Sequence, residues 1–253
     1  MNEVYLTGTL TKVPTIKTSR GGKPYLHLDL AGKRRVVKED GNTVEVPYYQ
    51  RATVFGIAAE RLGGSEVGTP VCVKGRLDYS DWVNAEGERR SSLKVAGFAV
   101  KTLAKTGIAV SSDSKGQPLM DGGVNEAFFE GNLTRDAELR YTPSGVAVTR
   151  LRVAVNEGEG DKRKTHYVDA TAWRELAERA ANLKKGQPVL VKGSLTSERY
   201  TDKEGTVRFA EGVEAGTVEV IDFGSHAKKA PTQEAQAQTR VDDAFPPEED
   251  LPF

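Results

Sequence analysis

The chain has 253 residues, of which 36 are basic and 36 acidic, so its formal net charge is zero. A single cysteine, Cys72, excludes an internal disulfide and a cysteine zinc site, and no apolar run approaches the roughly 20 residues of a membrane span. The neutral total hides an asymmetry, because residues 1–105 carry 17 Lys and Arg against 11 Asp and Glu, whereas residues 241–253 carry five acids and no base. We expect a cytoplasmic protein with a polyanionic partner.

The first half of the chain alternates apolar and polar residues in short runs, which is the pattern of half-buried strands. The first run begins at Val4, so we expect no signal peptide. A short apolar helix is predicted after the third strand, where Gly63 and Gly64 end it. In chain order, the predicted elements are strands at 4–8, 24–30 and 49–55, a helix at 57–62, and strands at 71–77 and 90–100.

The second half repeats the first. Asn, Glu, Gly, Leu and Thr of residues 2–11 recur at 125–134, and Pro-Val-Cys-Val-Lys-Gly-Arg-Leu at 70–77 recurs as Pro-Val-Leu-Val-Lys-Gly-Ser-Leu at 188–195. Strands are predicted at 146–155, 189–195 and 207–220. A helix is predicted from the spacing of Leu176, Ala180 and Leu183, with Gly186 as its stop. The repeat indicates two homologous domains.

We place the first domain at 1–105 and the second at 125–222. Residues 106–124 have the Ser, Gly and Lys content of a linker. Residues 223–253 bury too little apolar surface to fold and are predicted to be disordered, with an acidic end. Three strands, a helix and two further strands are the order of an OB-fold, so the expected fold class is all-β with two tandem five-stranded barrels, a fold that commonly binds oligonucleotides.

The third strand of each copy carries aromatic residues on one face. Alternate residues share a face, so Tyr49, Arg51 and Phe55 should point outward, while Ala52 and Val54 point into the barrel. The second copy repeats this parity, with Tyr167, Asp169 and Trp173 outward and Val168, Ala170 and Ala172 inward. Exposed rings on a sheet form a stacking platform for bases; the alternative is that the rings fill the core and the alanines face out.

A second aromatic follows the glycine of each Val-Lys-Gly motif by seven residues. It is Trp82 in the first copy and Tyr200 in the second, and each lies where a strand enters a polar, Gly-bearing hairpin. Aromatic residues at this hairpin fit the ligand-binding loop of the fold. The alternative is ordinary cross-strand packing.

Basic residues are candidates for phosphate contacts. They cluster in the long hairpin after the second strand of each copy, and others lie on or beside the predicted strands; for any one of them, a solvated loop is the alternative. The hairpin candidates are Lys33, Arg34, Arg35, Lys162, Arg163 and Lys164, and the strand candidates are Arg51, Lys74, Arg76, Arg140, Arg174, Lys192 and Arg199. Asp169 stands where the first copy has Arg51, which argues against a phosphate contact at that position.

Catalytic patterns were not found in the sequence. Its three histidines are scattered, no Gly-rich phosphate loop is followed by Lys-Ser/Thr, and Cys72 alternates with valines on a predicted strand. We expect no enzyme, no cofactor and no metal site.

Four stretches together resemble the bacterial single-stranded DNA-binding proteins, most closely their two-barrel form. They are Gly-Asn-Leu-Thr-Arg-Asp-Ala-Glu-Leu-Arg-Tyr-Thr-Pro at 131–143, residues 166–173, Val-Leu-Val-Lys-Gly at 189–193, and Glu-Asp-Leu-Pro-Phe at 249–253. The resemblance implies sequence-independent binding and protection of single-stranded DNA in replication, recombination and repair. It also implies base stacking by the six aromatics named above and a homodimer that presents four barrels.

The resemblance gives the acidic C-terminal end a role in docking replication, recombination and repair proteins. Physically, an apolar tip would fill a pocket while the neighbouring acids face a cationic rim. The expected docking residues are Glu248, Glu249, Asp250, Leu251, Pro252 and Phe253.

Two other functions compete with DNA protection. One is an adaptor that binds DNA weakly and proteins mainly, like an OB protein of a primosome. The other is an accessory module of an enzyme, like a tRNA-binding OB-fold, but no part of the chain is left for a catalytic domain.

Overall fold

The structure, a computed structural model, describes residues 1–38, 41–83, 87, 89–103, 107–201 and 207–221. Side chains are not described at 89, 90, 162, 198–201 and 207–210. The predicted tail at 223–253, with its docking tip, therefore lies outside the described residues. So do the side chains of Lys162, Arg199 and Tyr200.

The first copy forms a closed five-stranded barrel. Its β1 pairs with both β3 and β5, and β6 runs parallel to β4, which closes the cylinder. A minor strand, β2 (Lys17–Thr18), lies beside β3. The main elements are β1 (Asn2–Leu10), β3 (Pro24–Val37), β4 (Thr43–Phe55), α1 (Ile57–Leu62), β5 (Pro70–Val83) and β6 (Arg89–Thr102).

The second copy repeats the same barrel. Here β9 pairs with β11 and β13, β12 runs parallel to β14, and the minor strand β10 (Leu139–Tyr141) lies beside β11. The main elements are β9 (Asn125–Leu133), β11 (Ala147–Glu157), the 3-10 turn η1 (Gly160–Lys162), β12 (Lys164–Trp173), α2 (Arg174–Ala180), β13 (Pro188–Thr201) and β14 (Val207–Val220). The element order confirms the prediction of two OB-type barrels with a helix between the third and fourth main strands.

The glycine of the Val-Lys-Gly motif sits at the same irregularity in both barrels. The strand register shifts just before Gly75 and just before Gly193. A Cβ on Gly75 would lie 2.5 Å from the backbone oxygen of Ala96, and one on Gly193 would clash in the same way with Glu214. Glycine therefore permits the bulge that bends these long strands around the barrel.

The second helix is shorter than the sequence predicts. It ends at Ala180 with Ala181 as its cap, so Leu183 lies beyond the helix instead of on its last turn. Leu183 nevertheless packs against the core, and its carbonyl accepts a hydrogen bond from the backbone N–H of Ala137 (3.0 Å). The N–H of Leu183 bonds to the carbonyl of Ala180 (3.1 Å), three residues back instead of the four of an α-helix, so the chain has left the α-helical pattern before Gly186.

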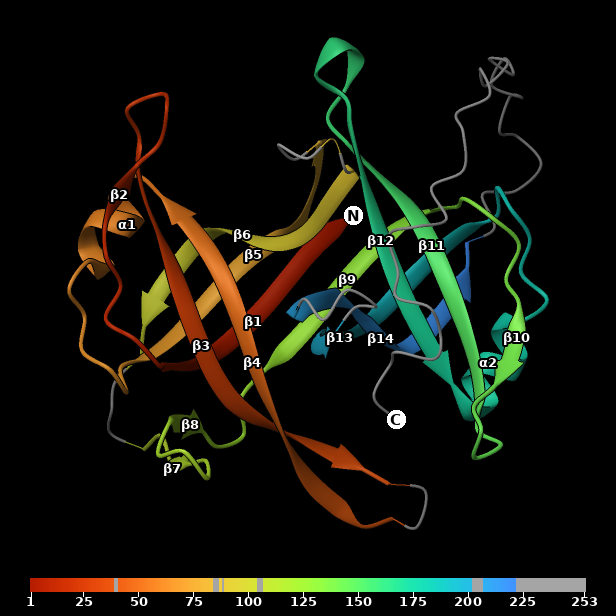
Figure 1. The fold of residues 1–253 in the computed structure, drawn as a ribbon, viewed down its shortest axis with the longest axis horizontal. Coiled ribbons are helices and arrows are strands. Elements are labelled where there is room, and N and C mark those ends of the chain that lie inside the picture. The colour runs from red at the N-terminus through yellow and green to blue at the C-terminus, as the bar shows by residue number, and fades with distance from the viewer. Residues whose placement is uncertain (39–40, 84–86, 88, 104–106, 202–206, 222–253) are drawn as a thin grey trace.

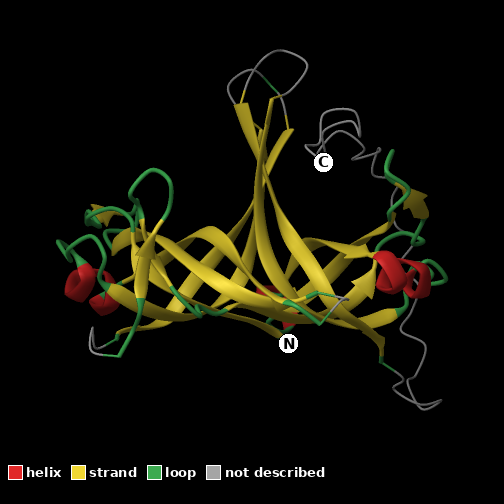
Figure 2. Ribbon diagram, turned by 90° about the horizontal axis from the view of Figure 1, so that it is seen from below, coloured by secondary structure: helices red, strands yellow, loops and turns green. Residues whose placement is uncertain are grey.

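The two barrels are joined through their first strands. β1 and β9 pair antiparallel and make one continuous sheet of both barrels (Figure 1). Val4 pairs with Ala127, its own counterpart in the repeat. Because equivalent residues face each other only across a two-fold axis, the barrels are related by an approximate two-fold axis, and Figure 2 shows a helix on the outer flank of each.

The asparagine that recurs at the start of each repeat has a structural role. The Asn2 side chain accepts a hydrogen bond from the N–H of Leu77 and donates one to its carbonyl, both at 2.9 Å. Asn125 makes the same two bonds to Leu195, at 2.9 and 3.0 Å. Each amide therefore continues the ladder between the first and fourth main strands of its own barrel.

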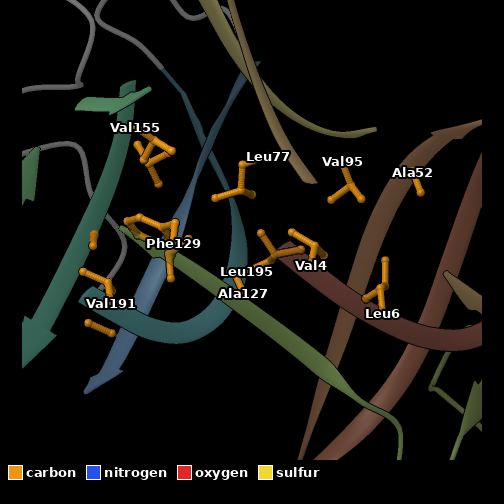
Figure 3. Close-up of a cluster of buried hydrophobic side chains, with 14 of the residues drawn as sticks. Val4, Leu6, Ala52, Leu77, Val95, Ala127, Phe129, Val155, Val191 and Leu195 are labelled. Atoms are coloured by element: carbon orange, nitrogen blue, oxygen red, sulfur yellow. The ribbon is translucent and has the colours of Figure 1, made fainter. Parts of the chain in front are cut away.

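The buried apolar side chains form one cluster that runs through both barrels. Leu6 of β1 and Phe129 of β9 are equivalent in the repeat and are both fully buried. Figure 3 shows them on neighbouring strands, with Leu77 and Leu195 lying between the two barrel interiors. The two domains therefore share a hydrophobic core across their junction.

The segment between the barrels contains a β-hairpin. The sequence assigns it linker composition, but β7 (Val110–Ser112) and β8 (Pro118–Met120) form a hairpin within it. β8 pairs with β3 of the first barrel, so the hairpin extends that barrel's sheet (Figure 1). In the described part of the chain, no helix has the length and apolarity needed to cross a membrane.

Candidate nucleic-acid interface

The third main strand of each barrel presents aromatic rings to solvent. On β4, Ala52 and Val54 are fully buried, whereas Tyr49 and Phe55 are 46% and 50% exposed. The predicted assignment of faces is therefore confirmed, and the alternative that these rings fill the core is wrong for this strand. Both rings are accessible from the same side of the barrel.

The second barrel has the same parity. Val168, Ala170 and Ala172 of β12 are buried, while Tyr167 is 38% exposed and Trp173 is half-buried. Trp173 and Phe55 are equivalent in the repeat, as are Tyr167 and Tyr49. The two barrels therefore carry aromatic rings at matching positions on matching faces.

Strand pairing adds residues that the sequence analysis missed. Tyr25 of β3 pairs with Phe55, and their ring centroids lie 5.7 Å apart. Lys17 of β2 pairs with Tyr25, which extends the row to a cation. One step along, His27 contacts the Thr53 hydroxyl at 3.0 Å. Partial burial, followed by the charge of Arg51, lowers the pKa of His27, so its ring is mostly uncharged at neutral pH.

The equivalent face of the second barrel is more basic. Arg140 of β10 pairs with Val148, which pairs with Trp173, so a cation flanks the ring as Lys17 does in the first barrel. Arg150, the counterpart of His27, pairs with Thr171 on the next step. The signal for these residues was the alternation of β3 and β11, because each outward position on these strands faces one on β4 or β12.

Arg51 and Asp169 occupy equivalent positions in two corresponding salt bridges, one in each barrel, in which the acid and the base have exchanged strands. In the first barrel, Arg51 of β4 pairs with Asp29 of β3, with one N–O distance of 3.1 Å. In the second, Arg152 of β11 pairs with Asp169 of β12 at 3.4 Å. Each barrel therefore keeps a cation on this row, and in the second barrel that cation is Arg152, a residue the sequence analysis did not name.

The two carboxylates of these bridges have different pKa shifts. Burial alone would raise the pKa of Asp29, but the hydrogen bond and charge of Arg51 outweigh it and lower the pKa. Burial dominates at Asp169 and raises its pKa despite the nearby guanidinium groups. Arg152 of the second barrel is thus paired with a carboxyl group of raised pKa, whereas Arg51 of the first barrel is paired with one of lowered pKa.

The turn that follows the outermost ring is constrained in both barrels. Gly56, which follows Phe55, has a φ of 64°, and Arg174, which follows Trp173, has a φ of 53°. Arg174 is the only non-glycine residue with positive φ in the described chain, a conformation that is unfavourable for residues with a Cβ. The backbone therefore turns in the same way at the end of β4 and of β12, and Phe55 and Trp173 occupy equivalent positions just before the turn.

A hairpin of the first barrel lies against the face of the second. Tyr79 of β5 packs edge-on against Tyr167, with ring centroids 5.6 Å apart, and the Arg152 guanidinium lies 5.5 Å from the centre of the Tyr167 ring. Trp82, further along β5, is 46% exposed. The predicted stacking residues Trp82 and Tyr167 thus come from two barrels that meet at this hairpin.

A polar cluster fixes this contact between the barrels. Buried His166 accepts a hydrogen bond at Nδ1 from the N–H of Tyr79 (3.0 Å), and its Nε2 lies 3.3 Å from Glu157. The guanidinium of Arg76 donates a hydrogen bond to the other carboxylate oxygen of Glu157, at 2.6 Å. Burial, then the charge of Lys164, lowers the pKa of His166, in keeping with a neutral ring that accepts at Nδ1.

Most of the predicted phosphate-contacting residues lie within ion-pair distance of a carboxylate. The side chains of Arg35, Arg163 and Arg174 are exposed to solvent. Lys74 and Lys192 lie beside Tyr5 and Phe128 of the joining strands, away from the aromatic faces. A phosphate could displace the exposed acids cheaply, because surface pairs contribute only about 0–1 kcal/mol. The pairs are Lys33 with Glu45 and Asp121, Arg34 with Glu214, Arg51 with Asp29, Lys74 with Glu3, Arg76 with Glu157, Arg140 with Glu138, Lys164 with Asp78, and Lys192 with Glu126.

The geometry supports binding rather than chemistry. Each barrel offers a row of exposed rings flanked by guanidinium or ammonium groups, which is what a flexible polyanion with planar bases requires. Among the described residues, no group of His, Cys, Asp and Glu could hold a metal ion.

Comparison with known proteins gives consistent matches. A model described as the single-strand binding protein family matches residues 1–103 and 124–221. The chain is 40% identical over 261 residues to the single-stranded DNA-binding protein of a Thermus thermophilus strain, covering 100% of this chain and 98% of that one. It is 39% identical over 232 residues to the protein of the same description from Deinococcus radiodurans, covering 89% of this chain and 77% of that one. The crystal structure of the wild-type single-stranded DNA binding protein from Thermus aquaticus superposes with a TM-score of 0.70 at 37% identity, covering 88% of this chain and 94% of that chain.

Proposed function

The chain belongs to the single-strand binding protein family, and from this we propose that it binds single-stranded DNA without sequence preference over the outward faces of β3–β4 and β11–β12. The observation that carries the proposal is the matched row of exposed rings and cations on both faces. Members of this family bind DNA and are not enzymes, so the bound strand is protected and presented, not altered.

In this proposal, bases stack on the rings while phosphates approach the flanking cations. Each stacked base contributes roughly 1–3 kcal/mol, and stacking tolerates any base because every base has a π-face. The first barrel would rely more on stacking, through Tyr25, Tyr49 and Phe55. The second would add charge through Arg150 and Arg152 to stacking on Tyr167 and Trp173. Trp82 and Tyr200, on the hairpins, would extend the path of the strand.

We also propose that the protein works in the bacterial cytoplasm as a homodimer that presents four barrels. Supporting this, Tyr5 and Phe128 lie on the outer side of the joining strands, edge-to-face with centroids 6.4 Å apart, and are only partly covered within one chain. A second chain on this surface would cover both rings.

The proposed binding is tested by intrinsic fluorescence. Trp82 and Trp173 are the only tryptophans of the chain, and both are proposed stacking residues. Titration with oligo-dT is expected to quench their emission strongly, and a matched duplex is expected to leave it nearly unchanged. Light scattering of the same sample is expected to give twice the chain mass of 27.5 kDa. Absence of binding to oligo-dT in this and an independent assay would leave the adaptor alternative.

We propose that the C-terminal tip, Glu248 to Phe253, recruits replication, recombination and repair proteins. Its composition supports this, since three acids precede an apolar Leu-Pro-Phe end. Deletion of residues 242–253 is expected to keep or tighten binding to oligo-dT, because five acids that compete with phosphate are removed. Capture of partner proteins is expected to be lost. A deletion that abolished DNA binding would contradict this assignment.

A further inference from the structure

The hairpin between the barrels is anchored to the first barrel. Met120 of β8 pairs with Gly32 of β3, and the hydroxyl of Thr9 donates a hydrogen bond to the carbonyl of Pro118 (2.7 Å). Leu119 and Met120 are buried, at 2% and 4% exposure. The hairpin therefore has a fixed position relative to the aromatic face of β3–β4.

The hairpin touches that face through two carboxylates. Asp113, in the turn between β7 and β8, accepts a hydrogen bond from the hydroxyl of Tyr49 at 2.6 Å. Asp121, just after β8, lies 3.6 Å from the ammonium group of Lys33. Tyr49 and Lys33 are neighbours on the outward face, because Tyr49 pairs with Ala31 and Lys33 follows two residues later. Both contacts thus fall on proposed DNA-binding residues.

The carboxylate of Asp113 is itself held in place. Its Oδ1 accepts hydrogen bonds from the backbone N–H groups of Lys115 and Gln117, both at 2.8 Å, which leaves Oδ2 for Tyr49. The hydrogen bond from Tyr49 is the main cause of the lowered pKa of Asp113. Partial burial, then the bond and charge of Asp113, raise the pKa of Tyr49 to about 12, so its hydroxyl remains a donor at neutral pH.

The ring of Tyr49 remains open to a ligand while its hydroxyl is held. The residue is 46% exposed, and the bond to Asp113 engages only the edge of the ring. In the second barrel, the equivalent Tyr167 is held differently, by the edge of Tyr79 and the guanidinium of Arg152. Each tyrosine is thus held by a residue from outside its own barrel: Tyr49 by Asp113 of the hairpin, and Tyr167 by Tyr79 of the first barrel.

We propose that Asp113 is a positioning residue for single-stranded DNA binding, which holds the Tyr49 ring through its hydroxyl in the orientation that stacks a base. The inference rests on the proposed function of the chain. A side chain that is ordered before binding loses less conformational entropy when the base arrives. The segment between the barrels is then part of the first binding face and not only a tether.

A double-mutant cycle in the full chain tests this. Asp113→Ala and Tyr49→Phe are each expected to weaken oligo-dT binding roughly three- to tenfold, the range expected for leaving one side chain to be ordered on binding. In the Tyr49→Phe background, Asp113→Ala is expected to cost less than about twofold, because the hydroxyl through which it acts is gone. Ser114→Ala, at the neighbouring exposed position, is the matched control and should bind as the wild type does.

A second variant separates positioning from the fold of the turn. Asp113→Ser keeps an oxygen for the backbone N–H groups of the turn but is one atom too short to replace the bond to Tyr49, so the same three- to tenfold loss is expected. Equal losses for Asp113→Ala in both backgrounds, or wild-type affinity of Asp113→Ser, would overturn the inference. Tighter binding by Asp113→Ala would overturn it too, because the carboxylate would then act as a competitor of phosphate. If the wild type does not bind oligo-dT, the proposed function itself fails, and the wild-type titration reveals this separately.

Discussion

Replacing Tyr167 and Trp173 together by alanine is expected to weaken binding to poly-dT by roughly 30-fold or more. Stacking contributes about 1–3 kcal/mol per base, so the two rings together account for about 2–6 kcal/mol. Both side chains are on the outward face of β12, opposite buried Val168, Ala170 and Ala172, so their removal should leave the barrel core intact. Fluorescence anisotropy of labelled poly-dT at fixed salt measures the loss.

The control for this variant keeps the rings and changes their chemistry. Tyr167→Phe with Trp173→Phe is expected to bind within about threefold of the wild type, because phenyl rings still stack. The slope of log K against log salt is expected to be unchanged in the alanine variant, since neither residue carries a charge that contacts phosphate. A changed salt slope, or an equal loss in the phenylalanine variant, would contradict stacking as the source of affinity.

The contrast between β4 and β3 shows which parts of this face the sequence reveals. Small residues such as Ala52 and Ala170, alternating with rings, identify the inward side of the third strand, because only one parity leaves a packable interior. Alternation on the second strand also puts Tyr25 and Arg150 at outward positions. Which residues of the third strand they lie beside depends on the register between the two strands, and a turn whose length is not known from the sequence does not fix that register.

The reversed salt bridge shows why position-by-position comparison of the repeats misleads. Asp169 against Arg51 suggested a lost cation, yet Arg152 against Asp29 restores it on the partner strand. Charge balance over a whole domain misleads in the same way. The second domain carries 15 basic and 17 acidic residues, but its outward face includes Arg150 and Arg152. Strand pairing, and not composition, places charge on a surface.

Contacts between distant segments could not be derived from local pattern. The hairpin at 110–120 has linker composition, and only its docking on β3 turns it into part of the first face. The cluster around His166 likewise depends on β5 of one barrel meeting β12 of the other. The second contact lies between the two barrels, whose relative placement follows the antiparallel pairing of β1 with β9, a pairing that neither strand's own sequence specifies.

Phe129→Ala is expected to lower the free energy of unfolding by about 3–5 kcal/mol, the usual cost of removing a large aromatic from a core. Phe129 is fully buried on β9, the strand that joins the second barrel to the first. Because the core is one cluster across both barrels, we expect a single shifted transition instead of the early loss of one domain. Urea denaturation at a fixed protein concentration, followed by circular dichroism, measures both quantities.

Phe55→Ala is the matched control, because it removes the same side chain from a position that is 50% exposed on the outward face. It is expected to change stability by less than about 1 kcal/mol and to weaken poly-dT binding, whereas Phe129→Ala should bind normally under conditions where it is folded. A loss of stability without a loss of binding in the Phe129 variant, and the reverse in the Phe55 variant, would separate residues that hold the barrels together from residues that contact DNA. Two unfolding transitions in the Phe129 variant, or a large stability loss in the Phe55 variant, would contradict that division. In that case, the inward or outward position of a side chain on its strand would not explain why Phe129 stabilises the fold and Phe55 binds DNA.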